Sequence, residues 1–167
     1  MDRPGALNRV RSAVRDFAAA YLPDVDRWCV ALSGGPDSLA LTAAAAGERP
    51  TTALIVDHGL QPGSDAVARS AAELATSLGC VGAQIITVQV GTAGGPEGAA
   101  RTARYAALEH ARTGAPVLIG HTLDDQAETV LLGLGRGSGP RSIAGIRPYD
   151  APWCRPLLTL RRADTEA

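Results

Sequence analysis

Short apolar runs alternate along this chain with longer segments in which apolar residues recur at helical spacing. The first run, Arg27–Leu32, is apolar enough to be a strand buried on both faces. Comparable runs predict further strands at Thr51–Val56, Gln84–Val90 and Pro116–Ile119. Apolar residues spaced three or four apart, such as Val10, Val14 and Phe17, indicate amphipathic helices. We expect helices at Leu7–Tyr21, Leu39–Ala46, Ser64–Leu78, Glu97–Arg112 and Thr122–Leu134.

Strands that alternate with helices of this length predict an α/β fold built on a parallel sheet. We expect a three-layer, Rossmann-like domain with helices on both faces of the sheet. Ligands of such folds bind beyond the carboxyl ends of the strands, where the strand order switches. The segments expected at that edge are Ser33, Asp57, His58, the Gly91–Gly98 stretch, Gly120 and His121.

Residues with special backbone preferences mark several element ends. Ser64 is the expected N-cap of its helix, and Gly79 is expected to end it. The Gly91–Gly98 stretch holds four glycines and one proline, which predicts a mobile loop.

Composition narrows the range of chemistries. The 167 residues correspond to one domain, and with only 4% aromatic residues its core must consist of aliphatic side chains. All 16 cationic residues are arginine, so Schiff-base lysines and lysine phosphate clamps are excluded. Three cysteines without a CxxC pair indicate reduced thiols and a cytoplasmic protein. The apolar stretches are too short and interrupted to predict a membrane span.

The first candidate site is Ser33-Gly34-Gly35-Pro36-Asp37-Ser38, between a predicted strand and a predicted helix. Strand, glycine turn and helix together aim backbone N–H groups at an anion such as phosphate. Both glycines can take a positive φ, and proline suits the first helical position. A carboxylate beside phosphates makes sense if a divalent cation lies between them. The alternative is an ordinary turn with capping residues; the loop is not a Walker A loop, because no Gly-Lys-Ser/Thr ends it.

The second candidate site is Gly120–Thr129, with the sequence GHTLDDQAET. Thr122 is the expected N-cap, with Asp125 reaching back to it from the third helical position. Asp125 and Glu128 then share one helix face, with Asp124 beside them. Capping explains one or two acids at a helix start but not all three beside His121. Such a cluster suits a metal ion or an ammonium group.

Two arginines of the predicted helix 97–112 are further candidates. Arg101 and Arg104 lie one helical turn apart, and the family resemblance given below implies that they could stabilise an adenylate or hold an RNA backbone. The alternative is a solvated helix face. Arg136 and Arg141 flank a glycine turn that suits phosphate.

The six residues Ser33–Ser38 resemble the pyrophosphate-binding loop of the PP-loop, or N-type ATP pyrophosphatase, superfamily, whose members split ATP between the α and β phosphates. The second motif, read with Arg136-Gly137-Ser138-Gly139-Pro140, is similar to the signature of tRNA(Ile)-lysidine synthetases. Further matches are Val56–Leu60, Ala99–Arg101 with Arg104-Tyr105, and Arg155–Leu158. The chain departs from that pattern at Thr122 and Gln61, where many members have His and Arg.

The resemblance implies an adenine nucleotide alpha hydrolase-like fold and a specific reaction. ATP would adenylate C2 of the wobble cytidine of a CAU-anticodon tRNA(Ile), and free L-lysine would displace AMP. At pH 7, neutralising a lysine ε-ammonium with a pKa near 10.4 costs about 4.6 kcal/mol, so a carboxylate must bind it and accept its proton.

The site residues that follow from the motifs and the resemblance fall into three groups. Those expected to be catalytic are Asp37, Arg104, Asp125 and Glu128. Those expected to bind ATP are Ser33, Gly34, Gly35, Pro36, Asp37, Ser38, Asp57, His58, Gly120 and His121. Asp37 and Asp124 are the expected Mg²⁺ ligands.

Two other functions stay open at this point. The chain could be another PP-loop enzyme, such as a tRNA thiolase or an amidotransferase synthetase domain, although thiolases usually need paired or catalytic cysteines. It could also be a non-catalytic ATP-binding module of the universal-stress type, which does not need the Asp-Asp-x-x-Glu cluster.

The resemblance also implies a division of the chain. Residues 1–160 would form the catalytic domain, and 161–167 would begin a connection to downstream tRNA-binding domains. Between residues 129 and 162 there are six arginines and one acid, an excess of five positive charges that is too small to bind a tRNA strongly. These residues alone should therefore bind ATP but modify tRNA poorly.

Overall fold

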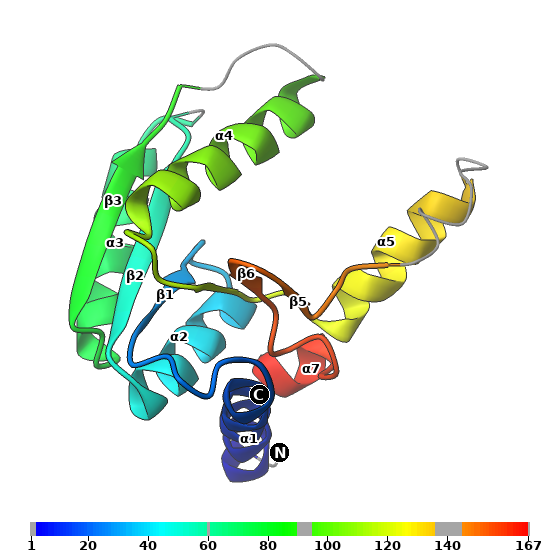
Figure 1. Ribbon diagram of the computed structural model, residues 1–167. Coiled ribbons are helices and arrows are strands. Elements are labelled where there is room, and N and C mark those ends of the chain that lie inside the picture. The colour runs from blue at the N-terminus through cyan, green and yellow to red at the C-terminus, as the bar shows by residue number, and fades with distance from the viewer. Residues whose placement is uncertain (1–2, 60, 90–94, 136–144, 167) are drawn as a thin grey trace.

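A computed structural model of the protein describes residues 3–59, 61–89, 95–135 and 145–166 (Figure 1). Its helices are α1 (Arg3–Tyr21), α2 (Pro36–Glu48), α3 (Ser64–Ser77), α4 (Gly95–Ala111), α5 (Leu123–Gly135) and α7 (Arg162–Thr165). Its strands are β1 (Trp28–Ala31), β2 (Thr51–Asp57), β3 (Gly82–Thr87), β4 (Val117–Ile119), β5 (Tyr149–Asp150) and β6 (Trp153–Cys154).

The strands form one sheet in the order β3-β2-β1-β4-β6-β5. All pairs are parallel except β5 with β6, which confirms the predicted parallel sheet with an antiparallel edge added. The chain winds outward from β1 to β2 and β3, then returns to place β4 on the other side of β1. The switch in strand order therefore lies between β1 and β4, where a ligand site is expected.

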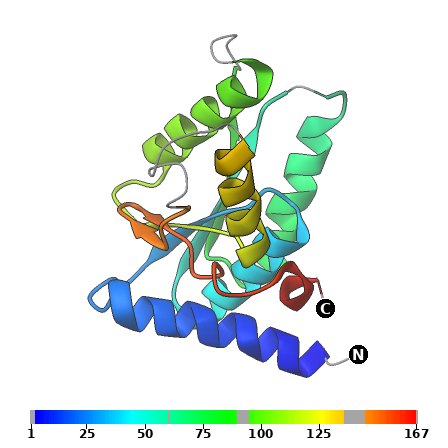
Figure 2. The same ribbon diagram turned by 90° about the vertical axis from the view of Figure 1, so that its right-hand side faces the viewer.

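Alternate residues of β1 face two different apolar layers, because successive strand residues point to opposite faces. Trp28 and Val30 belong to the layer built with α1, α2 and α3. Cys29 and Ala31 belong to the layer that includes Leu108 of α4. Figure 2 shows α3 and α4 on the two sides of the sheet, so helices on both faces are confirmed.

The carboxyl-terminal helix α7 lies beside α1 and α2 (Figure 1). Arg9 of α1 contacts Asp164 of α7 through an ion pair of 2.8 Å. The segment from residue 161 onward, expected to begin a connection, thus packs against the rest of the domain as far as residue 166. The proposed domain boundary itself stays a prediction.

The predicted strands and helices are all present, with shifts of a few residues at their ends. One cap was predicted wrongly: Gly63, with a φ of +82°, is the N-cap of α3, and Ser64 is its first helical residue. The positive φ at Gly63 lets the chain turn directly into the helix without a side-chain cap.

Only part of the predicted loop at Gly91–Gly98 can be compared with the structure. Residues 90–94 lie outside the described part of the chain, and 95–98 form the first turn of α4 instead of a loop. Within the described ranges, no helix is long and apolar enough to cross a membrane.

Candidate active site

The Ser33–Ser38 loop leaves the carboxyl end of β1 and opens α2. Gly34 has a φ of +86°, which only glycine adopts without strain. Gly35 is extended, with a φ of −77°, because it is the N-cap of α2. Pro36 occupies the start of α2 as predicted, and Asp37 lies in its first turn.

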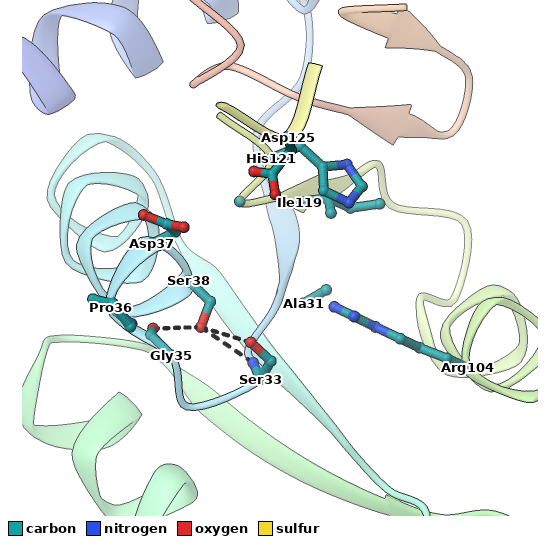
Figure 3. A pocket seen from close by; sticks show the side chains of 11 residues that line it. Ala31, Ser33, Gly35, Pro36, Asp37, Ser38, Arg104, Ile119, His121 and Asp125 are labelled. Carbon is teal, nitrogen blue, oxygen red and sulfur yellow. Dashed lines mark hydrogen bonds between the residues drawn. The ribbon is translucent and has the colours of Figure 1, made fainter. Parts of the chain in front are cut away.

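Ser38 holds this loop in shape (Figure 3). Its buried Oγ accepts hydrogen bonds from the Ser33 backbone N–H at 3.3 Å and the Ser33 hydroxyl at 3.1 Å. The same Oγ donates to the Gly35 carbonyl at 2.9 Å. The side chain of Ser38 is therefore committed to the loop itself, and its contribution to anion binding is to fix the backbone.

Gly120 brings the second motif against the first. It follows β4, whose Ile119 pairs with Ala31 of β1. A Cβ at Gly120 would lie 3.2 Å from the backbone carbonyl of Asp37 and from Cα of Ser38. Those are backbone atoms that cannot move aside easily, so only glycine allows β4 to end this close to the start of α2.

The two motifs enclose a small hollow of about 130 Å³. Figure 3 shows the Ser33–Ser38 loop on one side, Asp37 and Asp125 above it, and Arg104 entering from α4 opposite. The full lining is Ala31, Ser33, Gly35, Pro36, Asp37, Ser38, Arg104, Ile119, Gly120, His121 and Asp125. The hollow therefore joins a wall with anion-binding groups to a wall with carboxylates.

Arg104 and Arg101 were similar candidates by sequence, but their surroundings in the structure differ. Arg104 lines the hollow, and its burial lowers the pKa of its guanidinium. Arg101 is exposed and lies with its guanidinium carbon 5.1 Å from the centre of the Tyr105 ring. The structure therefore favours Arg104 as the cation of the hollow. For Arg101 it favours the alternative, a residue on the solvated face of the helix.

His121 is a neutral member of the site. Burial, followed by the nearby Arg155, lowers its pKa from 6.5 to about 4. Its Nδ1 is buried and has no hydrogen-bond partner within the described ranges. At pH 7 the imidazole is thus an uncharged group at the edge of an otherwise charged hollow.

The acids of α5 have separate contacts. Asp125 Oδ2 accepts the Thr122 backbone N–H at 2.7 Å and the Thr122 hydroxyl at 2.9 Å, which confirms that Asp125 reaches back to the helix start. Partial burial would raise the pKa of Asp125, but these bonds together with neighbouring charges, including Arg162, lower it. Asp124 Oδ2 accepts the backbone N–H of Arg162 at 2.7 Å. Glu128 is 63% exposed and lies 3.7 Å from the Arg162 guanidinium.

A second hollow, of about 360 Å³, lies on the other side of β1. It is bounded by β2, the turn after it and the apolar face of α3, and its lining includes Leu32, Ile55, Val56, Asp57, His58, Val67, Ala68 and Ala71. Asp57 accepts the Gly59 N–H at 2.9 Å and so shapes the turn. Ser33 lines both hollows and lies where they meet.

The carboxylates suit an Mg²⁺ ion that is bound partly by phosphates better than one that is bound by protein side chains alone. No three metal-binding side chains come together within the described residues. Mg²⁺ bound with phosphates often uses only one or two protein carboxylates. Asp37 fits that role, since it lies in the first turn of α2 beside the loop. Asp124 is engaged by Arg162 and does not line the hollow.

Sequence reasoning gave no role to several residues that hold the site. The Arg162 guanidinium lies among Asp37, Asp125 and Glu128, and the Thr165 hydroxyl bonds Asp37. Arg155 is buried beside His121 and donates to the Arg147 carbonyl. The signals available were the arginine-rich stretch 155–162 and the resemblance at Arg155–Leu158. Arg136 and Arg141 lie outside the described residues.

The chain is similar to known proteins over its whole length. Residues 8–167 match the PP-loop domain family. A protein from Mycolicibacterium paratuberculosis named tRNA(Ile)-lysidine synthase is 71% identical over 167 residues, all of this chain and 52% of that protein. One of the same name from Mycobacterium tuberculosis is 68% identical over all of this chain and 51% of its own length. The chain thus spans about half the length of the curated relatives it matches.

Solved structures share the fold at low sequence identity. The U34-tRNA thiolase NcsA of Methanococcus maripaludis, solved with its 4Fe-4S cluster, has a TM-score of 0.73 at 18% identity; the match covers 97% of this chain and 62% of that one. NMN synthetase of Francisella tularensis has a TM-score of 0.60 at 17% identity, covering 99% and 68%. At these identities the similarity establishes the fold alone.

Proposed function

Because this chain belongs to the PP-loop domain family, we propose that it uses ATP to join free lysine to C2 of the wobble cytidine of a CAU-anticodon tRNA(Ile). ATP use follows from the family; the lysine and the tRNA are our extension to this chain. A tRNA substrate and three free, buried cysteines favour a cytoplasmic enzyme.

One observation carries the proposal: anion-binding groups and carboxylates face one hollow between the starts of α2 and α5. The loop N–H groups and Arg104 suit the pyrophosphate part of ATP. The adjoining hollow has an apolar wall on α3 with polar groups at the end of β2, which suits adenine. Opposite the phosphates, Asp125 lines the hollow and Glu128 extends the acidic face of α5, which suits an ammonium. A reaction between ATP and an amine needs both the anion-binding groups and the carboxylates of this hollow.

The residues then have distinct tasks. The loop N–H groups and the N-terminus of α2 stabilise charge that develops on the departing pyrophosphate. Arg104 holds the negative charge of the nucleotide from the opposite wall. The acids of α5 bind the lysine ε-ammonium and take its proton, so that the neutral amine can attack the adenylated cytidine. His121 stays uncharged and so does not compete for either charge.

Asp37 would hold Mg²⁺ together with phosphate oxygens of the nucleotide. When bound, the ion would neutralise charge on the pyrophosphate. We assign Asp124 a weaker claim as a ligand, because it does not line the hollow.

Thiolation, the main alternative within the superfamily, is disfavoured by the cysteines. Cys29, Cys80 and Cys154 are all buried, and burial raises the pKa of each thiol, to about 12 for Cys154. A thiol with a raised pKa is a poor nucleophile, because the thiolate is the reactive form. A non-catalytic ATP module would explain neither the acids of α5 nor Arg104.

The deciding experiment measures AMP release by this chain with ATP, Mg²⁺ and lysine, at tRNA concentrations high enough to offset weak binding. We expect release that requires lysine and tRNA(Ile) bearing CAU, and little with tRNA(Met). ATP that binds and stays intact under all these conditions would favour the universal-stress alternative. AMP release that ignores lysine but requires a sulfur donor would favour thiolation.

A further inference from the structure

Arg162 connects the two halves of the site through three separate ion pairs. Its Nη2 lies 3.0 Å from Asp125 Oδ1, its Nε lies 3.5 Å from Asp37 Oδ2, and its Nη1 lies 3.7 Å from Glu128 Oε1. Each nitrogen of the guanidinium thus faces a different carboxylate. Two of the three acids belong to α5 and the third to α2, so one side chain spans both helix starts.

The backbone around Arg162 reinforces this contact. The Arg162 N–H donates to Asp124 Oδ2, and the Thr165 hydroxyl donates to Asp37 Oδ1. Just before it, the Leu160 carbonyl accepts the Leu123 N–H at 2.8 Å. Residues 160–165 therefore tie the start of α5 to the start of α2.

Most other ion pairs of the described chain are of a simpler kind. Arg15 with Glu48, and Arg69 with Asp65, are single pairs between partly or fully exposed side chains. Pairs of that type contribute little to stability. Arg162 instead supplies the cation to a group of like charges, and those carboxylates, Asp125 first, raise its own pKa. Without it, the acids would repel one another at close range.

The three acids are not equally free to meet a substrate. Asp125 uses Oδ2 for Thr122 and Oδ1 for Arg162. Asp37 uses Oδ1 for Thr165 and faces Arg162 with Oδ2. Glu128 is mostly exposed and only loosely paired, at 3.7 Å. An incoming ammonium that binds Glu128 would therefore break fewer existing contacts than one that binds Asp37 or Asp125.

We propose that Arg162 is a positioning residue that fixes Asp37 and Asp125 and leaves Glu128 as the carboxylate that receives the lysine ammonium. This inference rests on the proposed function for its lysine part. Arg162 couples the phosphate side of the site to the amine side without contacting the reacting atoms.

The test compares Arg162→Gln and Arg162→Lys with Arg9→Gln, which breaks the ion pair between α1 and Asp164 but contacts none of the three acids. Carboxyl ¹³C NMR at pH 7 should show changed chemical shifts for Asp37 and Asp125 in Arg162→Gln, shifts closer to those of the unaltered chain in Arg162→Lys, and no change in Arg9→Gln. The KM for lysine should rise about tenfold or more in Arg162→Gln, equivalent to at least about 1.4 kcal/mol, while the KM for ATP changes little.

Other results would overturn the proposal. Unchanged carboxyl chemical shifts would show that Arg162 does not hold the acids. Tighter lysine binding in Arg162→Gln would mean that Arg162 is a placeholder that the substrate displaces. Equal losses for ATP and lysine that follow a lower Tm would mean a structural role. If the unaltered chain has no lysine-dependent activity, the proposed function fails, while the NMR chemical shifts still decide whether Arg162 positions the acids.

Discussion

At the scale of single residues, the acids of the site differ in what already occupies their oxygens. Asp125 and Asp124 accept backbone N–H groups, whereas Glu128 has only a long ion pair. Asp37 lies between a hydroxyl and a guanidinium at the edge of the phosphate loop. Similar carboxylates can therefore serve as a helix cap, a metal ligand or a proton acceptor, according to their neighbours.

Replacing Asp37 with Asn should lower pyrophosphate release about 100-fold or more, because the carboxylate acts on charge that develops in the reaction. The fold should persist, since Asp37 lies outside the apolar layers. Pyrophosphate release and a thermal melt check both points. Asp65→Asn is the matched control, an acid in the first turn of α3 with its own arginine partner. Normal release by Asp37→Asn would remove Asp37 from the mechanism.

Glu128→Gln and Asp125→Asn should both raise the KM for lysine much more than the KM for ATP. They should differ in stability, because only Asp125 caps its helix: Asp125→Asn should cost about 1 kcal/mol and Glu128→Gln almost nothing. Urea unfolding and initial rates separate the two effects. Glu73→Gln, a change on α3 away from the site, serves as the control. Lysine kinetics that match the unaltered chain in both variants would contradict the assignment.

His121 should make stability depend on pH below neutrality. Its folded-state pKa of about 4 is lower than the ordinary value of 6.5, so between these values the unfolded chain binds a proton that the folded protein does not. Stability is therefore complete above pH 6.5 and falls as the pH is lowered, by about 2 kcal/mol between pH 6.5 and 5. Urea unfolding of the chain and of His121→Gln at both pH values measures this. Identical losses in the two proteins would show that His121 is not the cause.

At the scale of elements, two helices begin at the carboxyl ends of two adjacent strands, and they differ in charge. The start of α2 carries the glycine loop and one acid, whereas α5 begins with Asp124 and Asp125. Helix N-termini attract anions, so α2 suits phosphate. At α5, Asp124 and Asp125 already occupy the helix N-terminus, so its positive dipole end is compensated. Their negative charge suits a cation in place of an anion.

Gly120→Ala should separate these two helix starts. Its Cβ would lie 3.2 Å from backbone atoms of Asp37 and Ser38, so the variant should lose about 1–3 kcal/mol and bind ATP more weakly. Gly47→Ala in α2 is the control, because nothing lies within 4 Å of its Cβ. That change should instead stabilise by about 0.5–1 kcal/mol. Unfolding and ATP titration measure both, and a neutral Gly120→Ala would show that the helices adjust freely.

At the scale of the whole molecule, the sheet places two hollows on either side of the end of β1. The smaller has the charged groups and the larger has the apolar wall, with Ser33 at their junction. A ligand with a charged end and a flat apolar end, such as a nucleoside triphosphate, can occupy both at once. Neither half of the ligand alone would use all of these contacts.

ATP with Mg²⁺ should therefore stabilise the folded chain more than AMP or pyrophosphate does. At 100 times its Kd a ligand adds about 2.7 kcal/mol, which for a chain of this size is a rise in Tm of about 5–10 °C. Thermal melts with each ligand at the same concentration measure the shifts. Equal shifts with ATP and pyrophosphate would mean that the apolar hollow does not take adenine.

The sequence by itself determined most of the elements and much of the local chemistry. Apolar patterning located the long strands and helices but not the short β5, β6 and α7, and the reach of Asp125 back to Thr122 followed from their spacing of three. These features depend on residues close together in the chain, whose geometry the backbone fixes. The wrong assignments, at Ser64 and residues 95–98, concern element ends, where one residue more or less of helix costs little.

Only the tertiary structure decided which distant groups meet. Thr165 contacts Asp37 across 128 residues of sequence, and Arg162 contacts Asp124 and Asp125 across 38 and 37. Likewise, Arg104 enters the hollow while Arg101, one turn away, stays on the surface. Such contacts depend on the order of strands in the sheet and on where α7 packs. Local spacing cannot encode that order, because the free energy of a long-range contact is set by the packing of the whole domain.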